Sequence, residues 1–248
     1  QMLATDAILA LAAGEDVDVE ALAGGHRQIL GDAGLLDDFK AGALRLPGLA
    51  VLEAARQPAD PVALFTARRG LIASLGSALG DLVQGAVASR ETMIGSSGGR
   101  ALLTQLVELG VAAGDASSIT AAEKMVGDRN MTLSQGGLRA LIHCDDDARV
   151  RALLAFHDRW QADSLVMEKW FQMEAMSSIG GTTARLNELM AHPSFDPKNP
   201  NKIRAVLGAV MMGNTPRFHA ADGSGYGYIA KQIVEIDSRN PQVAARMA

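Results

Sequence analysis

ALLTQLVELG, residues 101–110, shows the pattern that runs through most of the chain. Its apolar side chains recur at the spacing of one helix face, and they are Leu102, Leu103, Leu106, Val107 and Leu109. The same spacing returns in residues 150–157 and 165–173, and the latter stripe is wide enough to indicate a helix buried on more than one side. No segment of useful length alternates apolar and polar residues as a strand does. The sequence therefore predicts an all-α protein.

The composition supports helices and narrows the class of protein. Of the 248 residues, 48% are hydrophobic and only 4% are aromatic, and the abundant alanine and leucine favour helices. A net charge of −5 argues against a nucleic-acid-binding protein, which would carry a basic surface. The single cysteine, Cys144, excludes an intramolecular disulfide framework and fits a reducing compartment. Since neither a membrane-length apolar run nor a basic leader is visible, we expect a soluble, cytoplasmic protein.

Glycine, proline and asparagine interrupt the helical pattern at short intervals. We therefore expect about ten helices, arranged as antiparallel hairpins in a superhelical, solenoid-like stack. The longest uninterrupted candidate runs from residue 61 to residue 90, and it contains four glycines spaced for close helix–helix approach: Gly70, Gly76, Gly80 and Gly85. No linker rich in proline, glycine or serine divides the chain. We predict a single domain over residues 1–248, with a softer joint near residues 58–61.

The residues with catalytic or metal-binding side chains form no recognisable set. None of the five histidines lies four residues from another, so a helical zinc pair is absent from the sequence. His143 and Cys144 precede three aspartates, but adjacent residues on a helix point in different directions and cannot all reach one ion. We interpret this stretch as a helix end at Cys144, with Asp145 capping the next helix. The sequence thus predicts no catalytic residues and no metal ligands in this chain.

Two Asn-Pro pairs, at residues 199–200 and 240–241, predict helix starts, because asparagine caps helices and proline fits the first turn. Arg204 follows the first of these starts, and Gln242 and Arg246 share one face of the second helix. A helix start beside a guanidinium favours carboxylate or carbonyl groups, so these three residues are candidate contacts for a peptide. The alternative is that the arginines pair with local acids such as Glu235 or Asp237.

Three long strings occupy the last part of the chain: WQADSLVMEKWF (160–171), HPSFDPKNPNKIRAVLGAV (192–210) and FHAADGSGYGYIAKQIVEIDSRNPQVAARM (218–247). Upstream, FKAGALRLP (39–47) and DRNMT (128–132) occur in the matching order. All five resemble the bacterial aminopeptidase N family, the M1 zinc metallopeptidases. The resemblance covers nearly the whole chain and is most specific from residue 160 onward.

The resemblance implies the C-terminal helical domain of such an enzyme, as a fragment truncated at both ends. The family's zinc motif, its substrate-amine motif and its transition-state tyrosine lie in an upstream catalytic domain. That domain would be this chain's partner within the parent protein, where it would hold the zinc cofactor. The parent would remove N-terminal residues from peptides in peptide catabolism, and this chain alone would be inactive. Its domain would enclose the active-site cavity and contact the peptide through Arg204, Gln242 and Arg246. Lys202 stands where the family often has arginine; lysine keeps the positive charge but lacks the planar fork of donors that a guanidinium presents.

Two other functions fit the same residues. The chain could be a stand-alone helical-repeat module that binds a protein partner, because it shows serial helical hairpins and no catalytic set. The weaker alternative is a helical enzyme that uses His143 and Cys144. If the chain is a fragment, we expect exposed apolar patches near both termini and self-association that covers them. We predict contacts with neither nucleic acid nor membrane.

Overall fold

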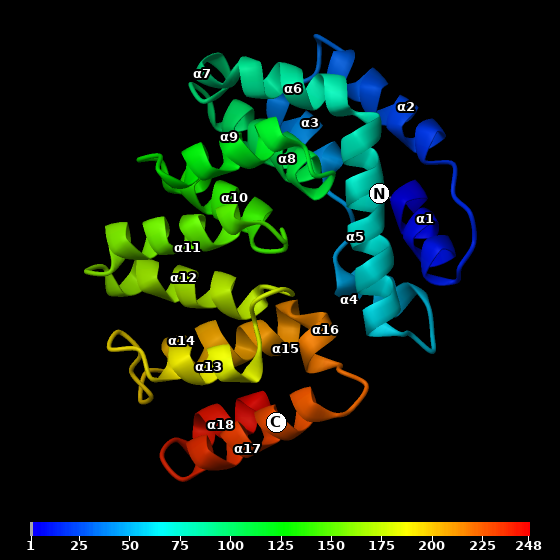
Figure 1. Ribbon diagram of the computed structural model, residues 1–248. Coiled ribbons are helices and arrows are strands. Elements are labelled where there is room, and N and C mark those ends of the chain that lie inside the picture. The colour runs from blue at the N-terminus through cyan, green and yellow to red at the C-terminus, as the bar shows by residue number, and fades with distance from the viewer. Residues whose placement is uncertain (1) are drawn as a thin grey trace. The chain divides into compact units, whose positions relative to one another are not determined.

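The computed structural model describes residues 2–248, and all regular secondary structure in that range is helical (Figure 1). The prediction of an all-α protein is confirmed. Within residues 2–248, nine helices have eleven residues or more, and shorter helices fill several of the connections between them. No single helix among the described residues is long and apolar enough to cross a membrane. Among them, only α5 (Pro61–Ala78) and α6 (Gly80–Ala88) together reach that length and apolarity, as a pair bent by 73°.

Residue contacts divide the chain into two compact units, residues 1–152 and 153–248. The boundary falls within α11 (Asp147–Trp160). Residues 58–61, where the sequence suggested a softer joint, lie inside the first unit.

The first unit is built from helices that pack both on their neighbours in sequence, as α9 (Ala116–Val126) and α10 (Met131–Leu141) do, and on helices further along the chain, as α3 (Asp37–Leu44) and α8 (Ser97–Ala112) do. Before α11, its elements are α1 (Met2–Ala12), α2 (Val19–Gly31), α3 (Asp37–Leu44), α4 (Leu49–Ala55), α5 (Pro61–Ala78), α6 (Gly80–Ala88), α7 (Arg90–Met93), α8 (Ser97–Ala112), α9 (Ala116–Val126) and α10 (Met131–Leu141).

Helix α8 is the centre of the first unit, because it contacts α3, α5, α6, α7, α9 and α10. All five apolar residues of the 101–110 stretch are buried, as the helical spacing predicts. Each fully buried leucine or valine of this kind contributes about 2 kcal/mol relative to an exposed position. The stretch from 61 to 90 is not one helix: α5 ends before Leu79, whose φ of −99° and ψ of 17° leave the helical region, and α6 starts in a new direction.

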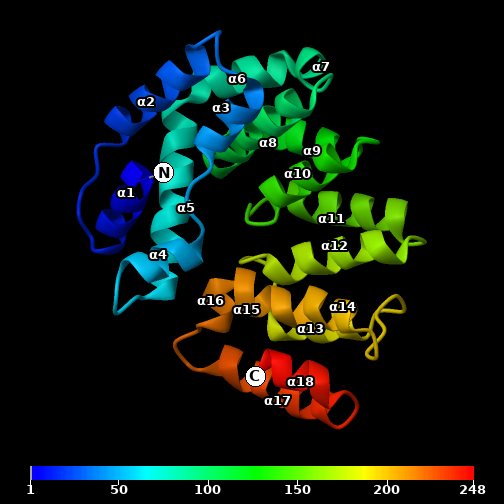
Figure 2. The same ribbon diagram turned by 180° about the vertical axis from the view of Figure 1, so that it is seen from behind.

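The second unit is organised around α12 (Ser164–Met176), which contacts four of the elements that follow it. The side chains of Met167, Trp170 and Phe171 are buried there, whereas Leu165 at the start of the same stripe is 70% exposed. Figures 1 and 2 show α17 (Ser224–Asp237) lying beside α18 (Pro241–Met247), in agreement with the contacts between these two helices. After α12, the elements are α13 (Thr183–Met190), α14 (Pro200–Ile203), the π-helical segment η1 (Arg204–Gly208), α15 (Ala209–Gly213), α16 (Thr215–Phe218), α17 (Ser224–Asp237) and α18 (Pro241–Met247).

Candidate functional site

Arg204 stands at the junction of an α-helix and a π-helix. Asn199 caps α14 as predicted, since its Oδ1 accepts the backbone N–H of Asn201 at 2.9 Å, and Pro200 occupies the first turn. The chain then widens into η1, where the N–H of Ala209 donates to the carbonyl of Arg204, five residues earlier. Single π-helical turns of this kind are rare and occur frequently at functional sites.

The Arg204 side chain is exposed, and it is held against its own helix. Its Nη2 donates to Asn201 Oδ1 at 2.7 Å, and its Nε donates to the carbonyl of Pro200 at 3.2 Å. A guanidinium has five N–H donors. The remaining donors have no recorded acceptor among residues 2–248, so Arg204 is a preorganised and still unsaturated donor group.

Gln242 and Arg246 lie on the exposed face of α18, one turn apart. Asn240 caps this helix through a 3.2 Å bond from the N–H of Val243, and Pro241 is in the first turn, again as predicted. Neither exposed side chain makes a hydrogen bond or an ion pair with any residue between 2 and 248. Both are therefore free to contact a ligand.

Among the described residues, Arg204 and Arg246 do not form the alternative salt bridges with Glu235 or Asp237. Glu235 pairs with Lys231, with Oε1 and Nζ 3.9 Å apart, and Arg204 bonds Asn201. Within residues 2–248, no salt bridge joins Arg204 or Arg246 to Glu235 or Asp237. No hydrogen bond or ion pair there links Arg204 to α18 either, so their convergence on one ligand stays a prediction.

Lys202 has a structural role that sequence reasoning missed. Its side chain is almost fully buried, and its ammonium donates to the carbonyl of Ser164 at the start of α12. Glu168 Oε1 lies 4.0 Å from the same nitrogen, and the Phe171 ring lies 5.6 Å from it. Burial lowers the pKa of Lys202, an effect that Glu168 and Asp163 oppose. The buried Lys202 side chain thus ties α14, the short helix directly before Arg204, to the core helix α12.

Two histidines fix the loop that leads into α14. The Nε2 atoms of His157 and His192 are 3.1 Å apart, and His192 Nδ1 accepts the backbone N–H of Ser194 at 3.1 Å. This assigns the proton between the rings to His192 Nε2, so that His157 Nδ1 donates to Asp158 at 3.0 Å. Burial, then His157, Arg185 and Lys202, lower the pKa of His192. The hydrogen-bonded pair therefore supports the segment that carries Arg204.

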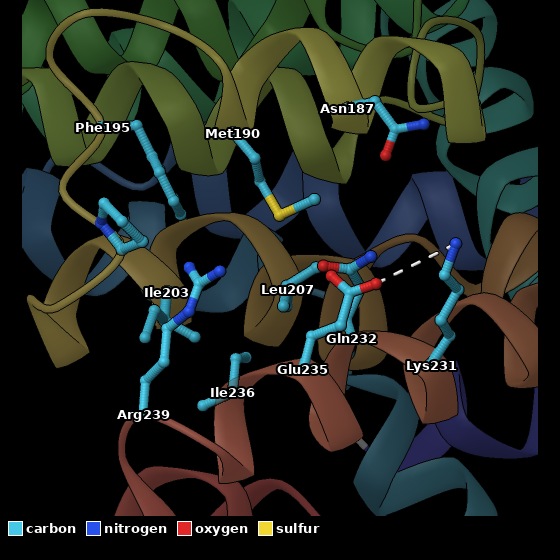
Figure 3. A pocket seen from close by; sticks show the side chains of 11 residues that line it. Asn187, Met190, Phe195, Ile203, Leu207, Lys231, Gln232, Glu235, Ile236 and Arg239 are labelled. Carbon is cyan, nitrogen blue, oxygen red and sulfur yellow. Dashed lines mark ion pairs between the residues drawn. The ribbon is translucent and has the colours of Figure 1, made fainter.

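A cleft of about 380 Å³ separates α17 from α13, α14 and η1 (Figure 3). We call it the amide cleft, because the Gln232 carboxamide points into it. Apolar side chains cover much of its wall, and charged groups of α17 and of the residues after it stand along one side. Its lining consists of Asn187, Met190, Phe195, Pro197, Ile203, Leu207, Lys231, Gln232, Glu235, Ile236 and Arg239.

His143 and Cys144 do not form a nucleophile pair. Helix α10 ends at Leu141, earlier than predicted, and Asp146 rather than Asp145 accepts an N–H of α11, from Ala148 at 2.7 Å. Burial and the nearby Asp146 raise the pKa of the Cys144 thiol. A raised pKa disfavours the thiolate that a cysteine nucleophile needs. In residues 2–248 no three His, Cys, Asp or Glu side chains are grouped to hold a metal ion.

Acid is expected to destabilise the first unit through His143. Burial, together with Arg69 and Arg68, lowers the pKa of His143 from 6.5 to about 3. The unfolded chain therefore binds a proton at His143 more tightly than the folded chain does. The stability that neutral His143 contributes is present above pH 6.5 and is lost as the pH falls toward 3. Between pH 7 and pH 5 we expect a loss of about 2 kcal/mol, measured by denaturant unfolding. His143→Gln should remove this part of the pH dependence, and an unchanged dependence in that variant would contradict it.

Comparison with known proteins agrees with this helical architecture. A family model described as a domain of unknown function (DUF3458_C) with ARM repeats matches residues 1–248. The chain belongs to this family. The DUF3458_C chain is 33% identical over 256 residues to the aminopeptidase N of Caulobacter vibrioides, covering 100% of the chain and 30% of that protein. It is also 37% identical over 118 residues to the Escherichia coli aminopeptidase N, covering 48% of the chain and 14% of that protein.

A solved structure shares the fold of this DUF3458_C chain. The crystal structure of Legionella pneumophila aminopeptidase A in complex with aspartic acid superposes with a TM-score of 0.82 at 22% sequence identity. The match covers 98% of the chain and 31% of that protein. The resemblance to aminopeptidase N is thus confirmed, and the chain spans about a third of these relatives' length or less.

Proposed function

We propose that this chain is the C-terminal helical domain of an aminopeptidase N of the M1 metallopeptidases, in which it encloses the active-site cavity and contacts the peptide substrate. The observation that carries this proposal is the match of the whole chain to 30% of the Caulobacter vibrioides aminopeptidase N. The parent enzyme would be cytoplasmic and would release N-terminal amino acids from peptides.

The zinc chemistry of such an enzyme does not fit the residues described. No group of three His, Cys, Asp or Glu side chains within 2–248 could hold the ion, so a catalytic domain elsewhere in the parent chain would have to bind it. A zinc ion there would activate water for attack on the peptide bond. The share of this domain is to bind and position the rest of the peptide.

The exposed hydrogen-bond donors of the second unit are suited to binding the peptide in this way. Arg204 is already oriented by Asn201, so little conformational entropy is lost when its free N–H groups meet a peptide carbonyl or carboxylate. Gln242 offers both a donor and an acceptor, and Arg246 offers a second charged fork. Together they would hold the peptide beyond its first residues.

A substrate-length comparison in the parent enzyme tests this role. For Arg204→Gln and Arg246→Gln, we expect kcat/KM on a tetrapeptide to fall about tenfold, the value of one hydrogen bond to a charged group. Alanyl-p-nitroanilide is too short to reach these side chains, so its kcat/KM should stay nearly unchanged. Arg217→Gln is the matched control, since Arg217 is another exposed arginine of the same unit. Equal losses on both substrates, or no loss on the tetrapeptide, would refute substrate contact by these residues.

Apolar side chains are exposed near both ends of the chain. We propose that they pack on the catalytic domain of the parent protein. Met2, Leu3 and Val234 are 77%, 71% and 72% exposed. Large exposed apolar side chains of this kind mark contact surfaces when they gather in patches. Self-association of the isolated chain through them stays a prediction.

A further inference from the structure

The Gln232 residue is largely buried, but its carboxamide reaches the open cleft. Gln232 is 9% exposed, and its side chain forms no hydrogen bond with any residue between 2 and 248. The oxygen and the nitrogen of the amide are thus both available to a ligand that displaces water. Figure 3 shows this carboxamide directed into the amide cleft. A ligand in the cleft could therefore supply the missing bonds.

The wall beside Gln232 is apolar. Ile203 and Leu207 are each 1% exposed, and Phe195 and Ile236 complete this side of the cleft. The volume of about 380 Å³ lies at the small end of the range for ligand pockets. An aliphatic group of a few carbons placed here would be removed from water on most sides.

The charges at the edge of the cleft favour one negative group. Lys231 Nζ and Glu235 Oε1 lie 3.9 Å apart and form a loose, solvent-exposed ion pair (Figure 3). Arg239 has neither an ion pair nor a hydrogen bond within residues 2–248, and it lies on the side of the cleft where Ile203 is drawn. One unpaired guanidinium remains, and guanidinium binds a carboxylate through two parallel hydrogen bonds. Glu235 would repel a second negative charge.

We propose that the amide cleft binds the N-acyl form of an aliphatic amino acid, which is the chemical group at the carboxyl end of a peptide. The aliphatic side chain would pack on Ile203 and Leu207, and the ligand amide would pair with the Gln232 carboxamide as both donor and acceptor. The carboxylate would bind Arg239. None of Arg204, Gln242 and Arg246 lines this cleft, so the binding site is separate from the substrate contacts proposed above.

N-acetyl-L-leucine is the probe, titrated into the full 248-residue chain labelled with ¹⁵N. We expect saturable binding with a shift of the Gln232 side-chain amide resonances, assigned from the spectrum of Gln232→Leu. Arg239→Gln and Gln232→Leu should each weaken binding about tenfold or more, as expected for hydrogen bonds to charged or buried groups. Arg217→Gln, on an exposed arginine outside the cleft, should leave the affinity unchanged.

Two ligands separate the contributions of the carboxylate and the aliphatic group. N-acetyl-leucinamide lacks the carboxylate and N-acetylglycine lacks the aliphatic side chain, so each should bind about tenfold more weakly than N-acetyl-leucine. Far-UV circular dichroism and the thermal midpoint establish that each variant is folded. Absence of saturable binding would overturn the proposal. So would control ligands that bind as tightly as N-acetyl-L-leucine, or an Arg239→Gln variant that binds as well as Arg217→Gln.

Discussion

Replacing Gly76 by alanine is expected to lower the free energy of unfolding by about 3 kcal/mol, the upper range for overpacking a tight contact. A Cβ at Gly76 in α5 would lie 2.0 Å from the backbone oxygen of Leu109 and 2.7 Å from its carbonyl carbon. That oxygen accepts the N–H of Ala113 at 3.0 Å, in the last turn of α8. The methyl group therefore meets rigid backbone, and the two helices must separate.

Gly70 provides a matched control in the same helix. A Cβ there meets nothing within 4 Å, so Gly70→Ala changes only helix propensity and should stabilise the chain by about 1 kcal/mol. Denaturant unfolding followed by circular dichroism measures both variants. Tight packing of α5 against α8 at Gly76 would be contradicted if both substitutions changed the free energy of unfolding in the same direction.

Replacing Arg185 by alanine is the second change with a large expected effect. Glu174 is only 4% exposed, and its two carboxylate oxygens accept from Arg185 Nη2 at 2.6 Å and from Nε at 3.3 Å. Arg185 also pairs with Glu188 at 2.8 Å, and hydrogen bonds to these carboxylates raise its pKa. Removing the guanidinium leaves the buried carboxylate of Glu174 uncompensated. We expect a loss of about 3 kcal/mol in the free energy of unfolding.

The control for this change is an ion pair at the surface. Arg151 Nε lies 2.8 Å from Glu123 Oε1, but the side chains are 60% and 28% exposed. Arg151→Ala should therefore change the free energy of unfolding far less than Arg185→Ala does. The substitution Glu174→Leu in the Arg185→Ala background should recover much of the lost stability, because no buried charge then remains. The explanation by a buried, uncompensated Glu174 carboxylate would be contradicted by either of two results. Arg185→Ala could lower the free energy of unfolding no more than Arg151→Ala, or the double variant could recover none of the lost stability.

The sequence predicted the helices and several of their starts, because these depend on neighbours only a few residues away. The caps at Asn199 and Asn240 formed as expected, since each side chain bonds an N–H two or three residues further along. The break at Leu79 was missed because the residues from 61 to 90 contain no proline after Pro61 that would mark a helix end. The spacing of the glycines indicated a close helix–helix contact but did not show which glycine makes it. Gly76 lies against the backbone of Leu109, whereas Gly70, Gly80 and Gly85 face open space.

The candidate site shows the same division. The helix starts identified Arg204, Gln242 and Arg246 as candidates, and the structure leaves all three exposed. The buried positions of Lys202 and Gln232 could not be predicted, because each depends on residues far along the chain. Lys202 bonds Ser164, which is 38 residues away, and Gln232 lines a cleft with Phe195 and Ile203.

What the sequence determined by itself is local order: helical periodicity, caps, and the strings that resemble the aminopeptidase N family. These features are read over short spans, within which a helix makes its own hydrogen bonds. Only the tertiary structure decided which glycine lies against a neighbouring backbone, which charges are buried, and which amide has no partner. Burial depends on all the atoms that surround a side chain, and packing brings those atoms together from distant parts of the sequence.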